Sequence, residues 1–424
     1  MAAQIDLTLE QAVAAVLGCI RPVEETEEAG LLCASGRVAA EDIYAPFANP
    51  PFDRSPLDGY ALRSADIRQA SAANPVRLRV IGEVCAGQVF PDRAAAGEAV
   101  RVMTGAKLPA ACDCVIRQED VKLWDAQGRL VDGLPPEKVL QRGDAFSAEI
   151  PYALQHHQNY CYAGEDIQQG ACLIREGTVL KAAQLGVLAS MGIARVRVWC
   201  RPRIVLCSTG DELLMPGEAL QEGKIYNSNL FLLAARLQEL GFAAEILGCL
   251  PDDAQAAAAQ IRSFEGRAEL FLSTGGVSVG KKDIMHAVVR ELSAEQLFWR
   301  MAMKPGAPAL AYRYGSLPGI ALSGNPFAAL ATFELLVRPV LARLSHRPQL
   351  VCARRTAILQ DDFLKKSQGR RFVRACYADG RVSLPGRNAS GMLFSAMACN
   401  AMLDIPAGSG ELHAGDPAEI VCLY

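Results

Sequence analysis

Four short polar loops in the second half of the chain carry residue types that bind phosphate and similar anions. Each loop directly follows a short apolar run, which is typical of the end of a strand in an α/β sheet. Glycines there let the backbone approach a ligand, and loop amides, hydroxyl groups and the start of the next helix bind anions. One such loop could serve turn geometry alone, but four in succession favour a ligand site. The predicted ligand-binding residues are Ser208, Thr209, Gly210, Asp211, Thr274, Gly275, Gly276, Ser278, Gly280, Ser323, Gly324, Asn325 and Pro326.

Acidic residues are expected at the same strand ends, namely Glu212, Asp252 and Asp283. Three converging carboxylates repel each other unless a hard cation lies between them. Mg²⁺ binds in such places through one or two carboxylates together with waters and substrate phosphates. The sequence therefore predicts a magnesium site with these three ligands. The alternative is that Asp252, Asp253 and Asp283 only cap helices, and the two roles do not exclude each other.

Two basic residues lie further along the chain. Lys304 precedes the rigid turn 305–308, which would hold its ammonium group in one place, and Arg300 lies four residues earlier. These cations suit an anionic ligand bound near the acidic loops. A solvated basic turn is the alternative.

The second half of the chain repeats a strand–loop–helix pattern. Apolar runs predict strands, and helical spacing with polar caps predicts a helix after each strand. Four such units predict a doubly wound α/β domain over residues 201–345, with the ligand loops at the carboxyl ends of its strands. The predicted strands are 204–207, 243–250, 269–272 and 319–322, and the predicted helices are 230–240, capped by Asn229, 254–264, 283–292 and 327–344.

The rest of the chain predicts a mixed domain and two small β domains. Thr8 begins a capping box for an N-terminal helix, while four prolines within residues 45–56 exclude a regular helix there. Gln127–Gly128 lies between two short runs, 121–124 and 129–131, and predicts a hairpin, as does Ala378–Arg381. The predicted domains are a mixed N-terminal domain formed by 1–45 and 153–200, a small β domain at 46–152, the α/β domain at 201–345, and a β domain at 346–424.

Composition excludes several classes of protein. The chain has 424 residues, with 43 Lys and Arg against 46 Asp and Glu, a balance that argues against a dedicated nucleic-acid or membrane-surface binder. No uncharged apolar run reaches the roughly 18 residues of a membrane span. The 14 scattered cysteines and an N-terminus without a signal pattern predict a cytoplasmic protein with reduced thiols. His156–His157 and the Cys112/Cys114 pair lack the spacing of metal sites.

Seven motifs resemble those of the molybdopterin molybdenumtransferase family, to which the C-terminal part of gephyrin is also similar. They occur in the family's order and cover essentially the whole chain. A lone Thr-Gly-Gly loop would be unspecific, whereas seven ordered motifs are highly specific. The motifs are Pro51–Ala61, which we call the signature loop, and Arg101–Ala106, Gly164–Asp166, Ser208–Leu213, Leu272–Gly280, Lys304–Pro308 and Gly324–Pro326.

The resemblance implies a fold and a reaction. Members of the family are elongated four-domain homodimers that insert molybdate into adenylylated molybdopterin, which releases AMP and yields molybdenum cofactor. The doubly wound domain would bind the pterin nucleotide, and Asp58 and Thr104 would face that domain of the partner subunit. Further implied partners are the molybdopterin adenylyltransferase and molybdoenzyme-specific chaperones. The implied catalytic residues are Asp58, Thr104, Asp166, Glu212, Arg300 and Lys304, the metal ligands are Glu212, Asp252 and Asp283, and Pro305 and Gly306 join the substrate-binding loops.

The chain departs from the family pattern mainly in charge. Cations are lost at Ala307 and Cys161–Ala163 and gained at Arg54 and at Lys281–Lys282. We expect Arg54 and at least one of the two lysines to compensate at the anionic ligand, and the alternative is that both lysines point into solvent. Asn227 stands where Asp is common and Ser323 where Pro is usual. An alternative function is that of a diverged paralogue that binds the pterin nucleotide as a carrier or scaffold without insertion. A third possible function is the preceding step, adenylylation, which uses a similar single α/β module. The long stretches of this chain outside that module argue against it.

Overall fold

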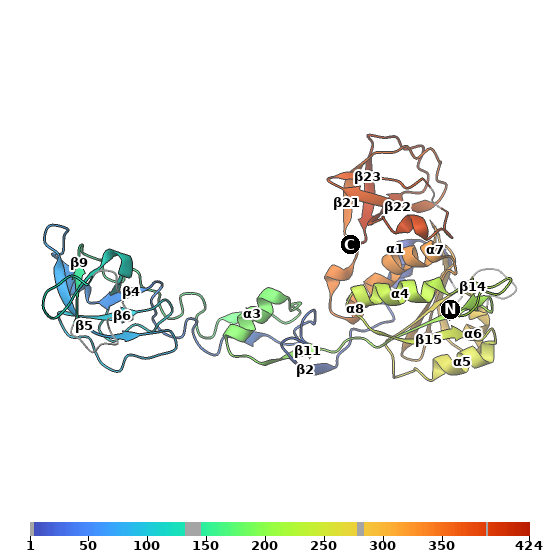
Figure 1. The fold of residues 1–424 in the computed structure, drawn as a ribbon. Helices are drawn as coiled ribbons and strands as arrows, with labels where there is room; N and C mark the ends of the chain where they lie inside the picture. The colour runs from blue at the N-terminus through green and yellow to red at the C-terminus, as the bar shows by residue number, and fades with distance from the viewer. Residues whose placement is uncertain (1–3, 132–145, 278–283, 387–388) are drawn as a thin grey trace. The chain divides into compact units, whose positions relative to one another are not determined.

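The computed structural model describes residues 4–131, 146–277, 284–386 and 389–424, and the chain divides into two compact units. The first unit consists of Met1–Glu41, Glu176–Lys181 and Arg195–Tyr424, and the second of Asp42–Arg175 and Ala182–Ala194 (Figure 1). The sequence predicts four domains, whereas this division gives two units, so the boundaries of the four domains stay predictions.

The first unit is built around a seven-stranded sheet. The four predicted strands lie side by side and run parallel, as the sequence predicts. Three further strands extend this sheet: β19 is antiparallel to both of its neighbours, and the short edge strand β1 is parallel to β17. The order is β1 (Gln4–Leu7), β17 (Glu295–Met301), β19 (Leu310–Tyr314), β20 (Leu317–Leu322), β16 (Leu270–Thr274), β12 (Ile204–Thr209) and β15 (Ala244–Leu250).

Helices cover both faces of this sheet, which confirms the doubly wound architecture (Figure 1). Ile204 and Leu206 of β12 point to one face, and Val205 and Cys207 point to the other, as expected from the alternation of side chains along a strand. The first face packs against α1 (Leu9–Leu17), α4 (Ser228–Glu239), α7 (Pro326–Thr332) and α8 (Arg338–Leu344), and the second against α5 (Ala254–Arg262) and α6 (Met285–Glu291).

Two details of these helices correct the sequence predictions. The cap of α4 is Asn227, not Asn229, because the Asn227 side chain accepts a hydrogen bond from Leu230 N. The predicted helix 327–344 is interrupted by a π-helical turn at Phe333–Val337. Pro339 follows that turn and has no backbone N–H. The regular series of α-helical hydrogen bonds therefore cannot continue past Pro339. The capping box at Thr8 is present as predicted.

A second sheet in the same unit is formed by the C-terminal strands. It closes on itself because β22 also pairs with β24, and the hairpin predicted at Ala378–Arg381 joins β22 to β23. The short strand at Met303–Lys304 pairs with Arg370 and Arg371 and so ties this sheet to the α/β part. The order is β18 (Met303–Lys304), β22 (Arg370–Ala378), β23 (Arg381–Ser383), β21 (Arg354–Leu359), β25 (Pro417–Cys422) and β24 (Ala401–Ile405).

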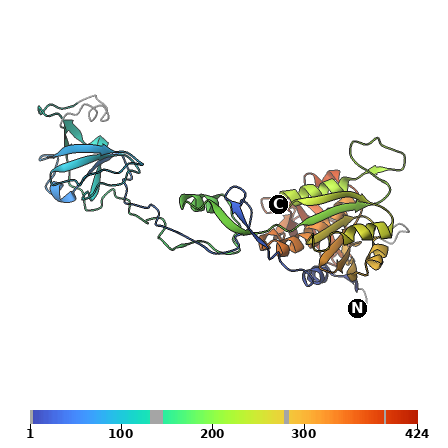
Figure 2. The same cartoon turned by 90° about the horizontal axis from the view of Figure 1, so that it is seen from below.

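A six-stranded sheet forms most of the second unit (Figure 2). The hairpin predicted around Gln127–Gly128 is only partly formed: β8 pairs regularly with β9, and the run 129–131 meets Trp124 through a single bridge to Leu130. The order is β7 (Cys114–Arg117), β4 (Gly59–Leu62), β6 (Glu98–Val102), β5 (Val76–Val84), β9 (Phe146–Ile150) and β8 (Lys122–Trp124).

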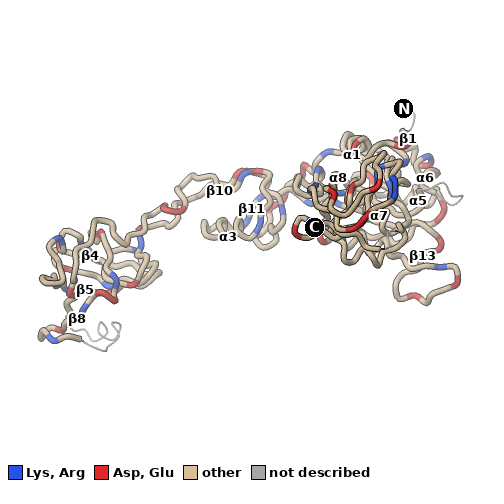
Figure 3. The backbone as a smooth tube through the Cα atoms, turned by 90° about the horizontal axis from the view of Figure 1, so that it is seen from above, with Lys and Arg blue, Asp and Glu red and all other residues tan. Residues whose placement is uncertain are grey.

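Two strand pairs and one helix lie outside these three sheets. In the second unit β3 (Ile43–Tyr44) pairs with β10 (Cys172–Ile174), which contacts α3 (Ala182–Ser190). In the first unit β2 (Thr26–Gly30) pairs with β11 (Arg195–Trp199). Basic and acidic residues are scattered over both units (Figure 3). Among the described residues, no helix has the length and apolar character that a membrane crossing requires.

Candidate active site

A cavity of about 580 Å³ lies where the parallel strands β12, β15, β16 and β20 end. The loops that follow these strands bring together the glycines, hydroxyl groups and carboxylates that the sequence predicts for a ligand site. The lining residues are Thr209, Gly210, Glu212, Leu213, Ile225, Tyr226, Asn227, Ser228, Asn229, Asp252, Thr274, Gly275, Gly276, Val277, Pro308, Ser323, Gly324, Asn325, Pro326 and Gly391. Ser208 lies behind this lining, fully buried.

The glycine after β16 is required by two independent constraints. Gly275 has φ of +90°, a conformation that side chains rarely adopt. A Cβ on Gly275 would also lie 2.5 Å from the carbonyl oxygen of Thr209 and 2.8 Å from its hydroxyl group. The loops after β12 and β16 can therefore approach each other only because no side chain separates them.

A buried network holds the strand ends in place. The Ser208 hydroxyl donates to Asn227 Oδ1 at 3.0 Å and lies 3.0 Å from the hydroxyl of Thr274. The same Asn227 oxygen caps α4, while its Nδ2 is buried and has no hydrogen-bond partner within the described part of the chain. Asn229 Nδ2 donates to the carbonyl oxygen of Gly324 at 2.8 Å, which links α4 to the loop after β20. From the sequence, Asn229 was expected only as a helix cap, and Asn227 was noted only as a departure from the family pattern.

The structure distinguishes the two adjacent aspartates after β15. Asp253 caps α5, since its carboxylate accepts from Ala256 N at 2.7 Å. Asp252 lines the cavity together with Glu212. The helix-cap alternative therefore applies to Asp253, whereas Asp252 faces the ligand cavity.

Several predicted residues lie outside the described part of the chain, namely Ser278, Gly280, Lys281, Lys282 and Asp283. Among the described residues, no group of three or more His, Cys, Asp or Glu side chains is arranged to hold a metal ion. Glu212 and Asp252 still fit Mg²⁺, because this ion is commonly bound through one or two carboxylates with the rest of its shell from water and substrate phosphates.

A second cavity of about 1050 Å³ adjoins the first. Lys304 lines it, and its other lining residues come from both the α/β part and the C-terminal sheet. Pro308, Ser323 and Asn325 line both cavities. The other lining residues are Met303, Lys304, Pro305, Gly306, Ala307, Ala328, Asp361, Asp362, Phe363, Leu364, Lys365, Arg371, Phe372, Val373, Leu384, Pro385, Gly386, Ala389 and Ser390.

The turn after Lys304 depends on Gly306, which has φ of +92°. A Cβ there would lie 2.2 Å from the hydroxyl of Thr332 on α7. Arg300 lines neither cavity; its Nε donates to Asp6 at 3.1 Å. The sequence missed the cavity residues of the C-terminal sheet, such as Arg371, because no local spacing connects them with Lys304.

The predicted residues Asp58, Thr104 and Asp166 belong to the second unit. Asp58 Oδ1 accepts hydrogen bonds from the backbone N–H and the hydroxyl group of Thr104, each at 2.7 Å. These two bonds lower the pKa of Asp58. Asp166 accepts from Asn49 Nδ2 at 3.2 Å.

The signature loop is bound to the segment that precedes Asp166. Asp53 accepts from the hydroxyl of Tyr160 at 2.6 Å and from Ala163 N at 2.8 Å. Arg54 and Cys161 exchange backbone hydrogen bonds in both directions. Two of the positions that depart from the family pattern are therefore adjacent in the fold.

Comparison with known proteins agrees with this geometry. Residues 7–192 match the MoeA N-terminal region (domain I and II), residues 205–343 match a probable molybdopterin binding domain, and residues 356–423 match the MoeA C-terminal region (domain IV). The molybdopterin molybdenumtransferase of Bacillus subtilis is 33% identical over 405 residues, covering 94% of this chain and 90% of the relative. That of Haemophilus influenzae is 33% identical over 423 residues and covers 98% of each chain.

A solved structure supports the same assignment. The molybdopterin biosynthesis MoeA protein of Pyrococcus horikoshii superposes with a TM-score of 0.82 at 30% identity and covers 99% of each chain. The sequence motifs, the cavity at the strand ends and these relatives all lead to one conclusion: the chain belongs to the molybdopterin molybdenumtransferase family.

Proposed function

We propose that this chain acts in molybdenum cofactor biosynthesis by inserting molybdate into adenylylated molybdopterin, in an Mg²⁺-dependent step that releases AMP. The observation that carries the proposal is the junction of two cavities with different chemistry. One has glycine loops and two carboxylates, the other has basic residues, and Pro308, Ser323 and Asn325 line both. A nucleotide-linked substrate and a small oxyanion could thus meet at one place.

The first cavity suits the diphosphate of the pterin nucleotide. At Gly275 and Gly276 no side chain shields the backbone, so a phosphate can approach the loop closely. Glu212 and Asp252 would hold Mg²⁺. Bound there, the ion would neutralise phosphate charge and so would ease departure of the AMP group.

The second cavity suits molybdate, a tetrahedral dianion. Lys304, Lys365 and Arg371 supply positive charge there, against Asp361 and Asp362. Arg371 lines this cavity, and among the described residues its Nε is buried without a hydrogen-bond partner. Transfer at phosphorus needs positioning and charge neutralisation more than a protein nucleophile, and these residues provide both.

Asp58, Thr104 and Asp166 belong to the second unit, whereas the residues that line the two cavities belong to the first. We propose a homodimer in which these residues act on the ligand held by the partner. Light scattering on a size-exclusion column at micromolar concentration should give twice the 45.4 kDa chain mass, and a monomer alone would contradict the dimer. We further propose a cytoplasmic protein, since all 14 cysteines are free, with the molybdopterin adenylyltransferase and molybdoenzyme-specific chaperones as transient partners.

The decisive experiment mixes the purified chain with adenylylated molybdopterin, Mg²⁺ and molybdate and measures AMP. AMP release should require both molybdate and Mg²⁺. Asp252→Asn should lower the rate at least about 100-fold, because it removes a charged ligand from the cavity. Asp253→Asn is the matched control: asparagine caps a helix as well as aspartate, so the rate should be unchanged.

Two other outcomes would redirect the proposal. If the chain binds adenylylated molybdopterin tightly but releases no AMP, the carrier or scaffold function replaces insertion. Ala307, where the family pattern has a second Lys, and Ser323, where it has Pro, line the second cavity and favour this candidate. If AMP appears at the same rate without molybdate, the chain hydrolyses the nucleotide and the insertion step is wrong.

A further inference from the structure

Two cysteine thiols meet in the C-terminal sheet, away from the residues assigned to the reaction. Cys376 lies near the end of β22, and Cys399 lies just before β24. Their sulfur atoms are 3.9 Å apart. β22 and β24 pair as antiparallel neighbours up to Ala375 and Ala401, so the two cysteines sit where the regular ladder ends.

The two thiols differ in exposure. Cys376 is partly exposed and donates to the carbonyl oxygen of Ala398 at 3.1 Å. Cys399 is only 7% exposed and donates to the carbonyl oxygen of Ser395 at 3.2 Å. Burial raises the pKa of Cys399 to about 12. An oxidant in solution therefore reaches Cys376 first, and Cys399 is positioned behind it.

The turn between the thiols and the cavities is held by one buried arginine. Arg374 is fully buried and donates to Ser395 Oγ at 2.5 Å and to the carbonyl oxygen of Ala389 at 2.7 Å. Ala389 lines the second cavity, and Gly391 lines the first. Ser395 is thus bonded both to Arg374 and, through its carbonyl oxygen, to Cys399. The thiol of Cys399 is therefore connected through Ser395 and Arg374 to Ala389 at the second cavity.

We propose that Cys376 and Cys399 are a redox modification site, at which a reversible disulfide tightens the turn 395–399 against β22. A disulfide brings the sulfurs from 3.9 Å to about 2.05 Å and removes both thiol hydrogen bonds. Disulfides in reducing compartments are mostly transient and redox-sensing, which fits a pair that is reduced in the structure.

The oxidant is a low-molecular-weight disulfide, and the exchange balances in two steps. The Cys376 thiol loses its proton to water, and its sulfur attacks one sulfur of the disulfide, so that one small thiolate leaves. Cys399 then loses its proton to water and attacks the Cys376 sulfur of the mixed disulfide, so that the second small thiolate leaves. Two protein thiols are oxidised by two electrons, and one small disulfide is reduced to two thiols.

The test uses the full chain and oxidised glutathione. The reduced protein is incubated with it, alkylated, digested with trypsin and mapped by mass spectrometry. Peptide 375–381 should be disulfide-linked to the C-terminal peptide that contains Cys399, and dithiothreitol should release it. Because that second peptide also contains Cys422, the Cys422→Ser variant serves as matched control and should give the same link. Cys399→Ser should instead leave Cys376 as its glutathione adduct.

A second readout follows the turn itself. Amide hydrogen exchange over residues 392–399 should slow about ten-fold on oxidation of the parent and stay unchanged in Cys399→Ser. The proposal is overturned if Cys376 in the parent stops at the glutathione adduct, if both thiols remain fully alkylated, or if Cys376 links to Cys422 instead. None of these results depends on the proposed reaction.

Discussion

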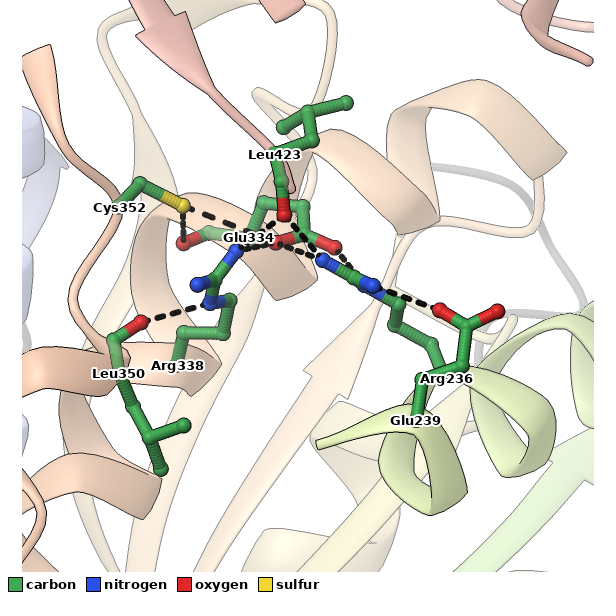
Figure 4. Close-up of polar contacts among 7 residues, drawn as sticks. All are labelled: Arg236, Glu239, Glu334, Arg338, Leu350, Cys352 and Leu423. Carbon is green, nitrogen blue, oxygen red and sulfur yellow. Dashed lines mark hydrogen bonds and ion pairs between the residues drawn. The ribbon is translucent and has the colours of Figure 1, made fainter. Parts of the chain in front are cut away.

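The carboxylate of Glu334 lies 2.5 Å from Nε of Arg236, and both side chains are almost completely buried (Figure 4). Arg338 reaches the same carboxylate at 2.6 Å, and both guanidinium groups also donate to the carbonyl oxygen of Leu423. One buried negative charge and its two arginines therefore join α4, the π-helical turn and α8 to Leu423, which directly follows β25.

Glu334→Gln should destabilise the fold by about 3–5 kcal/mol. The change leaves two buried guanidinium groups without their shared counter-charge, and such a loss costs far more than the net value of the ion pair. The measurement is urea unfolding followed by circular dichroism. Glu239→Gln is the matched control: Glu239 also pairs with Arg236, at 2.6 Å, but is 54% exposed, so its loss should cost at most about 1 kcal/mol. Equal costs for the two variants would contradict this account.

Much of the α/β fold could be predicted because its signals are local. Each of the four parallel strands is a short apolar run that ends in a polar loop, and in β12, β16 and β20 the side chains alternate between two core faces. β1 gave no such signal: it has four residues, and it is a strand only because β17, almost three hundred residues away in the chain, offers a partner. The π-helical turn was missed because apolar spacing continues through it.

Asn227→Ala should lower stability by about 1–3 kcal/mol. It removes the cap of α4, worth about 1 kcal/mol, and also the buried acceptor of the Ser208 hydroxyl. Chemical unfolding monitored by fluorescence measures the loss. Asp253→Ala removes a cap from α5 at an exposed position, so it should cost only the contribution of a helix cap, about 1 kcal/mol. If Asn227→Ala costs no more than Asp253→Ala, the bond to Ser208 contributes nothing.

The candidate site was predictable only in part, for a physical reason. Loops at strand ends converge in any doubly wound sheet, so Gly275 and Glu212 could be placed together without a structure. The sequence offers two adjacent aspartates, Asp252 and Asp253, as equally good helix caps. Which of them caps the helix depends on backbone geometry that the sequence does not show. Arg371 reaches the second cavity through pairing of β18 with β22, a long-range contact with no trace in residue spacing.

Thr104→Val should raise the pKa of Asp58 toward its ordinary value, because it removes the hydroxyl bond and keeps the backbone N–H bond. The carboxylate's pKa is lowered in the fold. Its stabilising contribution is therefore present above the ordinary Asp pKa and is lost as the pH falls through the lowered value. Carbon NMR titration of the Asp58 carboxyl measures the change. Thr104→Ser keeps the hydroxyl and should titrate like the parent, so a shift in both variants would point to loop rearrangement instead.

The last prediction concerns Arg374, whose guanidinium lies 3.9 Å from the centre of the Phe327 ring at the start of α7. Burial lowers the pKa of Arg374, and its charge is compensated by Ala389 O, Met392 O and Ser395 Oγ. A planar fork can serve acceptors spread over this segment, whereas a lysine ammonium is a single point.

Arg374→Lys should therefore speed amide exchange in residues 389–396 about ten-fold and cost roughly 1.5–3 kcal/mol in unfolding free energy. Arg381→Lys, at an exposed position on β23, is the control and should change neither quantity. Because Ala389 and Gly391 line the two cavities, the loosened segment should also weaken binding of adenylylated molybdopterin. Unchanged exchange in Arg374→Lys would show that the segment is held by its own turns and by the bond from Phe327 N to Ser390 O, and not by the arginine.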